Sequence, residues 1–143
     1  EAIVERSARM GAALVAGLRD LATTVPGIRE IRGRGLMIGV ELDPPALAID
    51  MPGLANRTST LVAQALVMRL LQRHRLLTQS TSKGSGVIKL VPPLVISEED
   101  VDWIVEAFRE SLVELARGRG AAVRGLIKMM RKAPGVVLRE AVQ

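Results

Sequence analysis

The sequence is poor in the residue types on which many functional sites depend. Its 143 residues include no cysteine, no tyrosine and one histidine, and Trp103 and Phe108 are the only aromatic side chains. The lack of cysteine excludes a disulfide framework, a thiolate zinc site and a cysteine nucleophile. A single histidine, His74, removes the usual His-based triads and multi-histidine metal sites, so we predict no metal site. The scarcity of rings argues against nucleic-acid-binding surfaces that stack bases on aromatic side chains.

Long hydrophobic runs are also missing from the sequence. No apolar run reaches the ~18 residues that a membrane-spanning helix needs, and the chain does not open with the pattern of a secretory signal peptide. We therefore predict a cytoplasmic protein without a membrane span. Apolar residues still make up 48% of the chain, which is enough for an aliphatic hydrophobic core.

The net charge of +5 is concentrated near the end of the chain. Residues 116–143 carry seven basic residues and one acid, a charge of +6, which leaves −1 for the other 115 residues. The basic residues of this segment are Arg117, Arg119, Arg124, Lys128, Arg131, Lys132 and Arg139. The high isoelectric point thus describes a tail, and we do not expect the main body to bind nucleic acid.

Apolar periodicity and turn residues predict an alternation of helices and strands. The expected elements are a helix that ends before Pro26, strands at 28–32 and 36–42, a helix from about 56 to 75, strands at 76–78 and 87–91, and a helix that Ser97 begins. Short turns between consecutive strands favour antiparallel pairing. We therefore predict an α+β fold in which helices cover a small, three- to four-stranded, mainly antiparallel sheet.

Two clusters that suggest a ligand have a structural explanation as well. The glycines of Gly33–Gly39 suggest a nucleotide-binding loop, but their spacing differs from the dinucleotide fingerprint and the segment leads into a strand instead of a helix. We interpret it as a hairpin turn. The acids at 98–102 could bind a metal, but Ser97 before them is typical of a helix start with a capping box, in which Asp100 is an imperfect member.

Other polar side chains have a surface interpretation. Arg29, Arg32 and Arg34, together with Arg57, could form an anion-binding patch, or they could be solvated at the edge of the sheet. His74 lies among arginines near the end of a predicted helix. We interpret it as a solvated residue, because no orienting partner for a catalytic base is evident.

Lys89 interrupts the apolar strand Val87–Val91, directly before two prolines. Strand alternation places it on the face opposite Ile88 and Leu90. A cation there either points to solvent or points into a site that needs positive charge, such as one that receives a carboxylate. The strand pattern alone leaves both positions open and favours solvent.

Three segments share features with one family. They are Ile31–Leu42 (IRGRGLMIGVEL), Leu76–Thr81 (LLTQST) and Val87–Asp100 (VIKLVPPLVISEED). In this order and spacing they resemble the C-terminal small domain of class III pyridoxal-phosphate-dependent aminotransferases, a group that includes the ornithine, acetylornithine, γ-aminobutyrate and putrescine aminotransferases. The resemblance covers about residues 2–116.

This resemblance implies a pyridoxal 5′-phosphate enzyme of fold type I that works as a homodimer with active sites at the subunit interface. Its reaction would transfer an amino group from an amino donor to a 2-oxo acid or aldehyde, through a pyridoxamine form of the cofactor. In the family the large domain holds the cofactor, so the Schiff-base lysine is expected upstream of Glu1. The resemblance thus implies no catalytic residue in this chain, and we predict that residues 1–143 alone are inactive.

The family's small domain supplies an arginine, in the strand before the double proline, that holds the substrate carboxylate. Lys89 stands at the matching position and is the one substrate-binding residue that the resemblance implies here. An ammonium provides the charge without the planar two-point fork of a guanidinium. This departure implies looser carboxylate recognition, a different donor such as a polyamine or ω-amine, or another residue that holds the carboxylate. The small domain would also close the substrate pocket.

We expect three parts along the chain: a helix at 1–27 that leads in from a missing large domain, the small domain at 28–116, and a basic helical tail at 117–143. The tail either packs back on the same protein or docks on an acidic partner, a carrier domain or an anionic membrane surface. An alternative from another class is a non-catalytic α+β interaction module with a basic docking helix. Burial of the opening helix distinguishes the two, because an exposed apolar face would indicate a missing domain.

Overall fold

The computed structural model describes residues 3–47, 55–81 and 86–118, and these residues form three long helices and a four-stranded sheet. In chain order the elements are α1 (Ile3–Thr24), β1 (Ile28–Arg34), β2 (Met37–Leu42), the 3-10 helix η1 (Pro45–Leu47), α2 (Ala55–His74), β3 (Gln79–Ser80), β4 (Val87–Leu90) and α3 (Glu98–Arg117). The predicted basic tail lies, from residue 119 on, outside the described residues. Within the described ranges, no helix is long and apolar enough to cross a bilayer.

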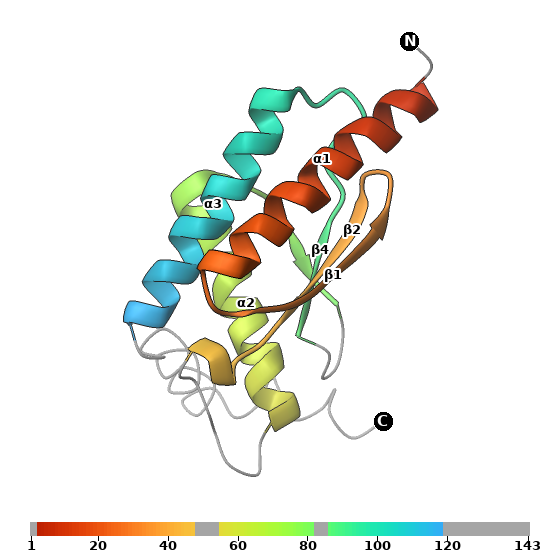
Figure 1. Ribbon diagram of the computed structural model, residues 1–143. Helices are drawn as coiled ribbons and strands as arrows, with labels where there is room; N and C mark the ends of the chain where they lie inside the picture. Colours follow the sequence, from red (N-terminus) through yellow and green to blue (C-terminus); the bar gives the residue numbers. More distant parts are fainter. Residues whose placement is uncertain (1–2, 48–54, 82–85, 119–143) are drawn as a thin grey trace, which may run out of the picture.

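The four strands form one antiparallel sheet in the order β1-β2-β4-β3. Helix α1 packs on β1 and β2, α2 packs on β2, β3 and β4, and α3 packs against both of these helices (Figure 1). The sheet residues that face the helices are almost fully buried, among them Ile38, Val40, Ile88 and Leu90. The predicted α+β fold, with helices over a mainly antiparallel sheet, is confirmed.

Strands β1 and β2 form the hairpin that the glycine pattern predicts. Arg34 pairs with Met37, so Gly35 and Leu36 make a two-residue turn. Gly35 has a φ of +54°, a left-handed backbone conformation that favours glycine. The sequence predicts Leu36 as the first residue of the strand, but it lies in the turn, where its side chain is buried.

The core consists of aliphatic side chains around one aromatic ring. Phe108 is fully buried in it, whereas Trp103 is 43% exposed on the surface of α3. The buried apolar side chains of α1 are Met10, Leu14, Leu18 and Leu21. Most of the apolar stripe predicted on the opening helix is therefore covered within this chain, although Ile3 and Val4 in its first turn are exposed.

Helix α1 crosses the β1–β2 hairpin with the two backbones in contact. A Cβ atom on Gly11 would overlap the carbonyl oxygen of Gly35. Further along the helix, a Cβ atom on Gly17 would lie 2.8 Å from a methyl carbon of Val105 in α3. The small residues of α1 thus let both the hairpin and α3 approach closely.

The third strand lies later in the sequence than predicted. The pattern predicts a strand at 76–78, but β3 begins only at Gln79. The backbone N–H groups of Arg75 and Leu76 donate to carbonyl groups in the last turn of α2, and Arg75 has a φ of 57°. These bonds close the C-terminal end of the helix and use amide groups that a strand would need. The strand therefore begins at a later residue than the apolar pattern predicts.

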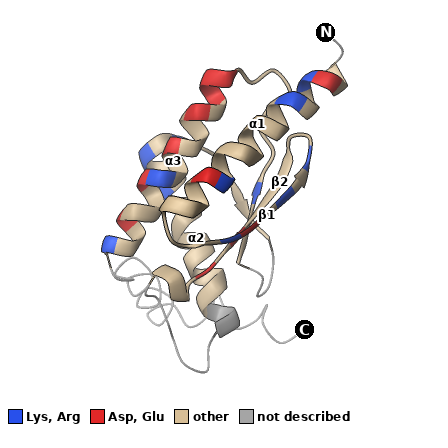
Figure 2. Cartoon of the chain, in the orientation of Figure 1, with Lys and Arg blue, Asp and Glu red and all other residues tan. Residues whose placement is uncertain are grey.

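Charged side chains are distributed unevenly over this fold. Acidic residues occur along the whole of α3 and dominate its first turn (Figure 2). Basic residues occur on α1 and on the strands (Figure 2). The acidic first turn fits the positive end of the helix dipole, as the sequence predicts.

Candidate functional site

The outer face of the sheet carries one row of residues across all four strands. Arg32 of β1 pairs with Gly39 of β2, Gly39 pairs with Lys89 of β4, and Lys89 pairs with Gln79 of β3. Directly paired residues of antiparallel strands point to the same face of a sheet. Since the residues on either side of this row in β2 and β4 are buried, the row faces away from the helices.

Lys89 is an exposed cation in the middle of this row. Within residues 3–47, 55–81 and 86–118, its ammonium group makes no hydrogen bond or ion pair. Gly39 beside it has no side chain. Met37, which is 63% exposed, lies two residues before Gly39 on the same face of β2, and Val91, which is 58% exposed, directly follows β4. The predicted site residue thus lies on an open face of the sheet, beside a gap and two apolar side chains.

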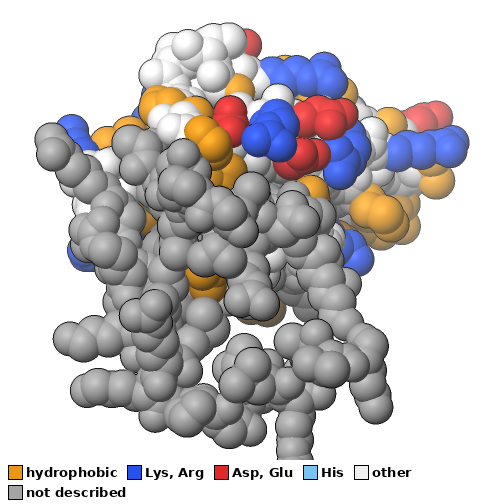
Figure 3. Space-filling view, turned by 90° about the horizontal axis from the view of Figure 1, so that it is seen from below, with side chains coloured by type: hydrophobic (Ala, Val, Ile, Leu, Met, Phe, Trp, Pro, Cys, Tyr) orange, Lys and Arg blue, Asp and Glu red, His pale blue; other side chains and the backbone are white. Residues whose placement is uncertain are grey.

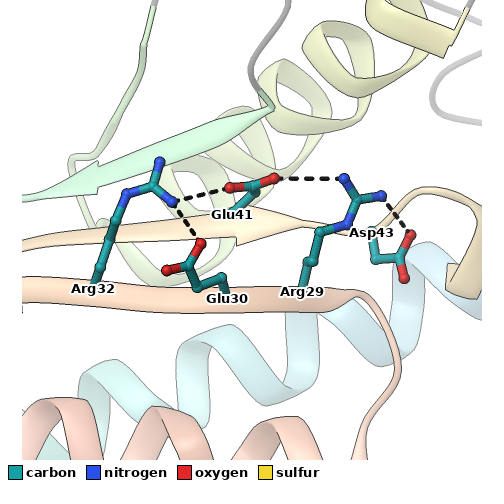
Figure 4. Close-up of polar contacts among 5 residues, drawn as sticks. All are labelled: Arg29, Glu30, Arg32, Glu41 and Asp43. Carbon is teal, nitrogen blue, oxygen red and sulfur yellow. Dashed lines mark hydrogen bonds and ion pairs between the residues drawn. The ribbon is translucent and has the colours of Figure 1, made fainter.

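Five charged side chains form a connected cluster next to this row, on β1, β2 and the residue that follows β2 (Figure 4). A guanidinium nitrogen of Arg32 lies 2.8 Å from a carboxylate oxygen of Glu30 and 3.0 Å from one of Glu41. Arg29 lies 3.4 Å from the same Glu41 and 3.1 Å from Asp43. Glu41 therefore bridges the two arginines.

Both guanidinium groups are paired with these carboxylates. The hydrogen bond to Asp43 is the main cause that raises the pKa of Arg29, and the hydrogen bond to Glu41 is the main cause that raises the pKa of Arg32. Arg29 and Arg32 are thus engaged with acids, which favours a role in the sheet over an anion-binding patch; the side chain of Arg57 lies outside the described residues. Seen from below, the described surface carries acidic and basic side chains side by side (Figure 3).

His74, at the end of α2, has a carboxylate neighbour that the sequence does not reveal. Its Nε2 lies 3.6 Å from Oε2 of Glu110 on α3, and its side chain is only 15% exposed. The histidine, expected to be solvated, is therefore largely buried between two helices. Arg69 of α2 also pairs with Glu114 of α3. The histidine thus belongs to a polar contact between α2 and α3.

The acids at 98–102 form the first turn of α3. Ser97 is the N-cap, and its hydroxyl oxygen accepts a hydrogen bond of 3.1 Å from the Asp100 N–H. The Asp100 carboxylate accepts one of 2.8 Å from the Ser97 N–H. The capping box is complete, which confirms the predicted helix start. In the part of the chain that the structure describes, no group of three or more histidine or acidic residues could hold a metal ion.

A groove of about 420 Å³ lies between α1 and α3. Its lining comprises Ala13 and Gly17 of α1, together with Glu98, Val101, Asp102, Val105 and Glu106 of α3. The charged part of this lining is entirely acidic. Carboxylates repel phosphate and carboxylate groups, so the groove is unsuited to an anionic ligand.

The described residues do not form a complete site for pyridoxal 5′-phosphate. Lys89 is the only lysine among them, and it lies on the open face of the sheet and not in a pocket. The groove between α1 and α3 has an acidic lining, whereas a phosphate needs donors or positive charge. This part of the chain can present a side chain to a cofactor site but does not enclose one.

The neighbours of Lys89 in this row are not predictable from local patterns. Alternation within β4 predicts the exposed face of Lys89, and the structure agrees. Gly39 and Gln79 become its neighbours through the register of β2 and β3 against β4, which no single segment determines. Gln79 also lies outside the strand predicted at 76–78. The polar LLTQST segment is the one sequence signal that points to it.

Comparison with known proteins matches this chain to one family. A family model for class III aminotransferases matches residues 1–112. The diaminobutyrate–2-oxoglutarate aminotransferase of Rhizobium meliloti (strain 1021) is 32% identical over 120 residues, 82% of this chain and 24% of that protein. Ornithine aminotransferase 1 of Staphylococcus aureus (strain Mu50) is 38% identical over 110 residues, 77% of this chain and 22% of that protein. The chain thus spans about a quarter of the length of the curated relatives it matches.

Solved structures show the same similarity. A transaminase from the marine bacterium Virgibacillus superposes with a TM-score of 0.68 at 27% identity, over 80% of this chain and 25% of that chain. The omega transaminase from Pseudomonas jessenii, in complex with PMP, superposes with a TM-score of 0.64 at 30% identity, over 82% of this chain and 24% of that chain.

Proposed function

The chain belongs to the class III aminotransferase family, and we propose that it forms the C-terminal small domain of such an enzyme. Support comes from the family match over residues 1–112 and from three segments, 31–42, 76–81 and 87–100, that resemble this domain in order and spacing. The complete enzyme would transfer an amino group from an amine or amino acid, with polyamines and ω-amines among the candidates, to a 2-oxo acid or aldehyde. Relatives named for diaminobutyrate and ornithine favour a donor with a second amino group.

Class III aminotransferases use pyridoxal 5′-phosphate, the carrier of the amino group between the two substrates. We propose that residues outside this chain, in a large domain, hold the cofactor and supply its lysine. The open position of Lys89 and the acidic groove between α1 and α3 support this division, because neither can enclose a phosphorylated ring. We also propose that the complete enzyme is a homodimer with active sites at the subunit interface. Its proposed location is the cytoplasm.

Lys89 provides the contribution of this chain to the reaction. Its ammonium would bind the substrate carboxylate and orient the substrate while the small domain closes the pocket. The position supports this role, since Lys89 is exposed, makes no ion pair within the described ranges and matches the family's arginine. An ammonium is a compact charge with three rotatable donors, so a carboxylate is less rigidly oriented on it than on a guanidinium.

Enzyme kinetics test the proposal. They are measured on the complete polypeptide that contains this chain, after it has been loaded with pyridoxal phosphate. Amino transfer is measured from ornithine, diaminobutyrate and putrescine to 2-oxoglutarate. We expect Lys89→Met to raise the KM for 2-oxoglutarate by about 10- to 100-fold, because one charge-assisted hydrogen bond is lost. Lys89→Arg should retain binding, since it restores the family's residue.

A matched control is Arg73→Met, which removes an exposed cation from the last turn of α2. Its KM should equal that of the wild type. Absence of amino transfer with every donor would contradict the family role of the chain. A wild-type KM in Lys89→Met would contradict the role of Lys89 alone.

One observation favours a second candidate, a non-catalytic α+β interaction module. The apolar face of α1 from Met10 to Leu21 is buried against the strands and α3, so the chain has a core of its own. In this reading exposed apolar side chains would contact a partner, and the segment 117–143 would dock on an acidic or carrier domain. The exposed apolar residues beyond α1 include Met37, Leu77, Val91, Leu94 and Val95. Such a module would show no amino transfer in the assay above.

A further inference from the structure

Lys89 has one polar neighbour directly across the sheet. Gln79 of β3 and Lys89 of β4 are paired residues of antiparallel strands. Their Cβ atoms therefore lie about 4.5–5.5 Å apart on the same face. Both side chains are exposed, and neither makes a hydrogen bond or ion pair within the described ranges.

We propose that Gln79 and Lys89 together bind the α-carboxylate of the 2-oxo acid acceptor, whose remaining part extends over the side-chain-free position Gly39. This inference rests on the proposed function and adds a second binding residue to it. A carboxylate has two oxygens, whereas an ammonium is a single point of charge. The Gln79 amide supplies N–H donors beside that charge. Two side chains on neighbouring strands thereby replace the two-point contact that one guanidinium would make.

Gly39 leaves space for the ligand on the other side of Lys89. Its φ is not among the positive values of the described glycines, so its backbone does not require glycine. A Cβ atom there would meet its nearest neighbour, a methyl carbon of Val87, at 3.4 Å, which is an ordinary contact. Neither backbone nor packing therefore excludes alanine at Gly39. The space is available to a molecule that contacts Lys89.

The other cation of the row is already engaged. Arg32, across Gly39 from Lys89, forms ion pairs with Glu30 and Glu41. Those two carboxylates would also repel an anion that approached from the Arg32 side. An incoming carboxylate is therefore directed to the Lys89 side of the gap, where Gln79 is the adjacent donor.

The experiment compares acceptors that differ only in the α-carboxylate, using the holoenzyme of the complete polypeptide. Pyruvate is paired with acetaldehyde, and 2-oxoglutarate is paired with succinic semialdehyde. We expect Gln79→Leu to raise the KM for both 2-oxo acids by about tenfold, with kcat little changed and with both aldehydes unaffected. Gln79→Glu should raise the KM for both 2-oxo acids further, because the new carboxylate repels the carboxylate of the acceptor.

Two more variants separate this role from a structural one. Gly39→Ala should raise the KM for the 2-oxo acids without lowering the melting temperature, since its methyl group fills the ligand space and not the core. Gln72→Leu makes the same chemical change on an exposed face of α2 and should leave every KM unchanged.

The outcomes distinguish the inference from the function on which it rests. An enzyme that transfers amino groups, but whose 2-oxo acid and aldehyde KM values respond equally to Gln79→Leu, would overturn the Gln79 assignment alone. Activity with aldehydes and none with 2-oxo acids would also overturn it. A wild type that is inactive with every acceptor would overturn the proposed function, and this inference with it.

Discussion

Two residues, Ser97 and Asp100, determine where α3 begins. The Asp100 carboxylate accepts hydrogen bonds from the backbone N–H and the hydroxyl of Ser97, at 2.8 and 3.0 Å. The backbone bond is the main cause that lowers the pKa of the Asp100 carboxyl, and the hydroxyl bond adds to it. The ionised carboxylate also suits the positive end of the helix dipole. Folding therefore favours the charged form of Asp100.

Replacing Asp100 by asparagine should make the chain less stable at neutral pH and change little in acid. Because the folded state lowers the pKa of this carboxyl, its contribution is complete above the unfolded-state pKa of about 4. That contribution disappears as the pH falls through the lower folded-state value. Urea unfolding of the wild type and of Asp100→Asn at pH 7 and between pH 2 and 4 measures the difference. A difference that stays constant with pH would contradict this account.

Short-range chemistry at the residue scale is predictable from the sequence. Ser97 as an N-cap and Lys89 on the exposed face of its strand both follow from neighbours a few positions away. The contact of His74 with Glu110 does not follow, because these residues lie on different helices. Only the packing of α2 on α3 brings the two side chains together.

At the scale of elements, the contact of α1 with the β1–β2 hairpin depends on a missing side chain. Gly11→Ala should destabilise the chain by about 1–3 kcal/mol, because the new methyl group forces the backbones of α1 and the turn apart. At an exposed helical position the same change would stabilise by up to about 1 kcal/mol. Thermal and urea unfolding measure the effect. Gly39→Ala, which adds the same methyl group where it fits, is the control, and equal stability of both variants would contradict the prediction.

The position of a helix or strand is predictable from the sequence where its residues show a clear amphipathic pattern. Apolar periodicity predicts the opening helix, but only the structure shows that Gly11 of this helix contacts the turn at Gly35. The shift of the third strand from 76–78 to Gln79–Ser80 is not predictable from that pattern. It depends on hydrogen bonds by which Arg75 and Leu76 close α2, and apolar periodicity does not reveal them.

At the scale of the whole molecule, strand order brings the candidate site together. Strand β4 lies between β2 and β3, so Lys89 receives one neighbour from each side. The alternation of elements predicts the fold class but leaves this order and register open. The sequence therefore identifies the cation, whereas Gly39 and Gln79 emerge only from the assembled sheet.

The same architecture predicts how the 143-residue chain behaves toward its family's cofactor. Its four lysines are Lys83, Lys89, Lys128 and Lys132. Lys89, the one within the described residues, lies on an open face where water competes for any bond to the cofactor aldehyde. We expect no stoichiometric absorbance of lysine-bound pyridoxal phosphate, and no single lysine labelled after borohydride reduction and peptide mapping. Nα-acetyl-lysine, at four equivalents to match the four lysines of the chain, gives the background absorbance of an exposed amine with the cofactor. Circular dichroism checks that the protein sample is helical. One lysine labelled at one equivalent per chain would locate the cofactor site in this chain and contradict the proposed division between two domains.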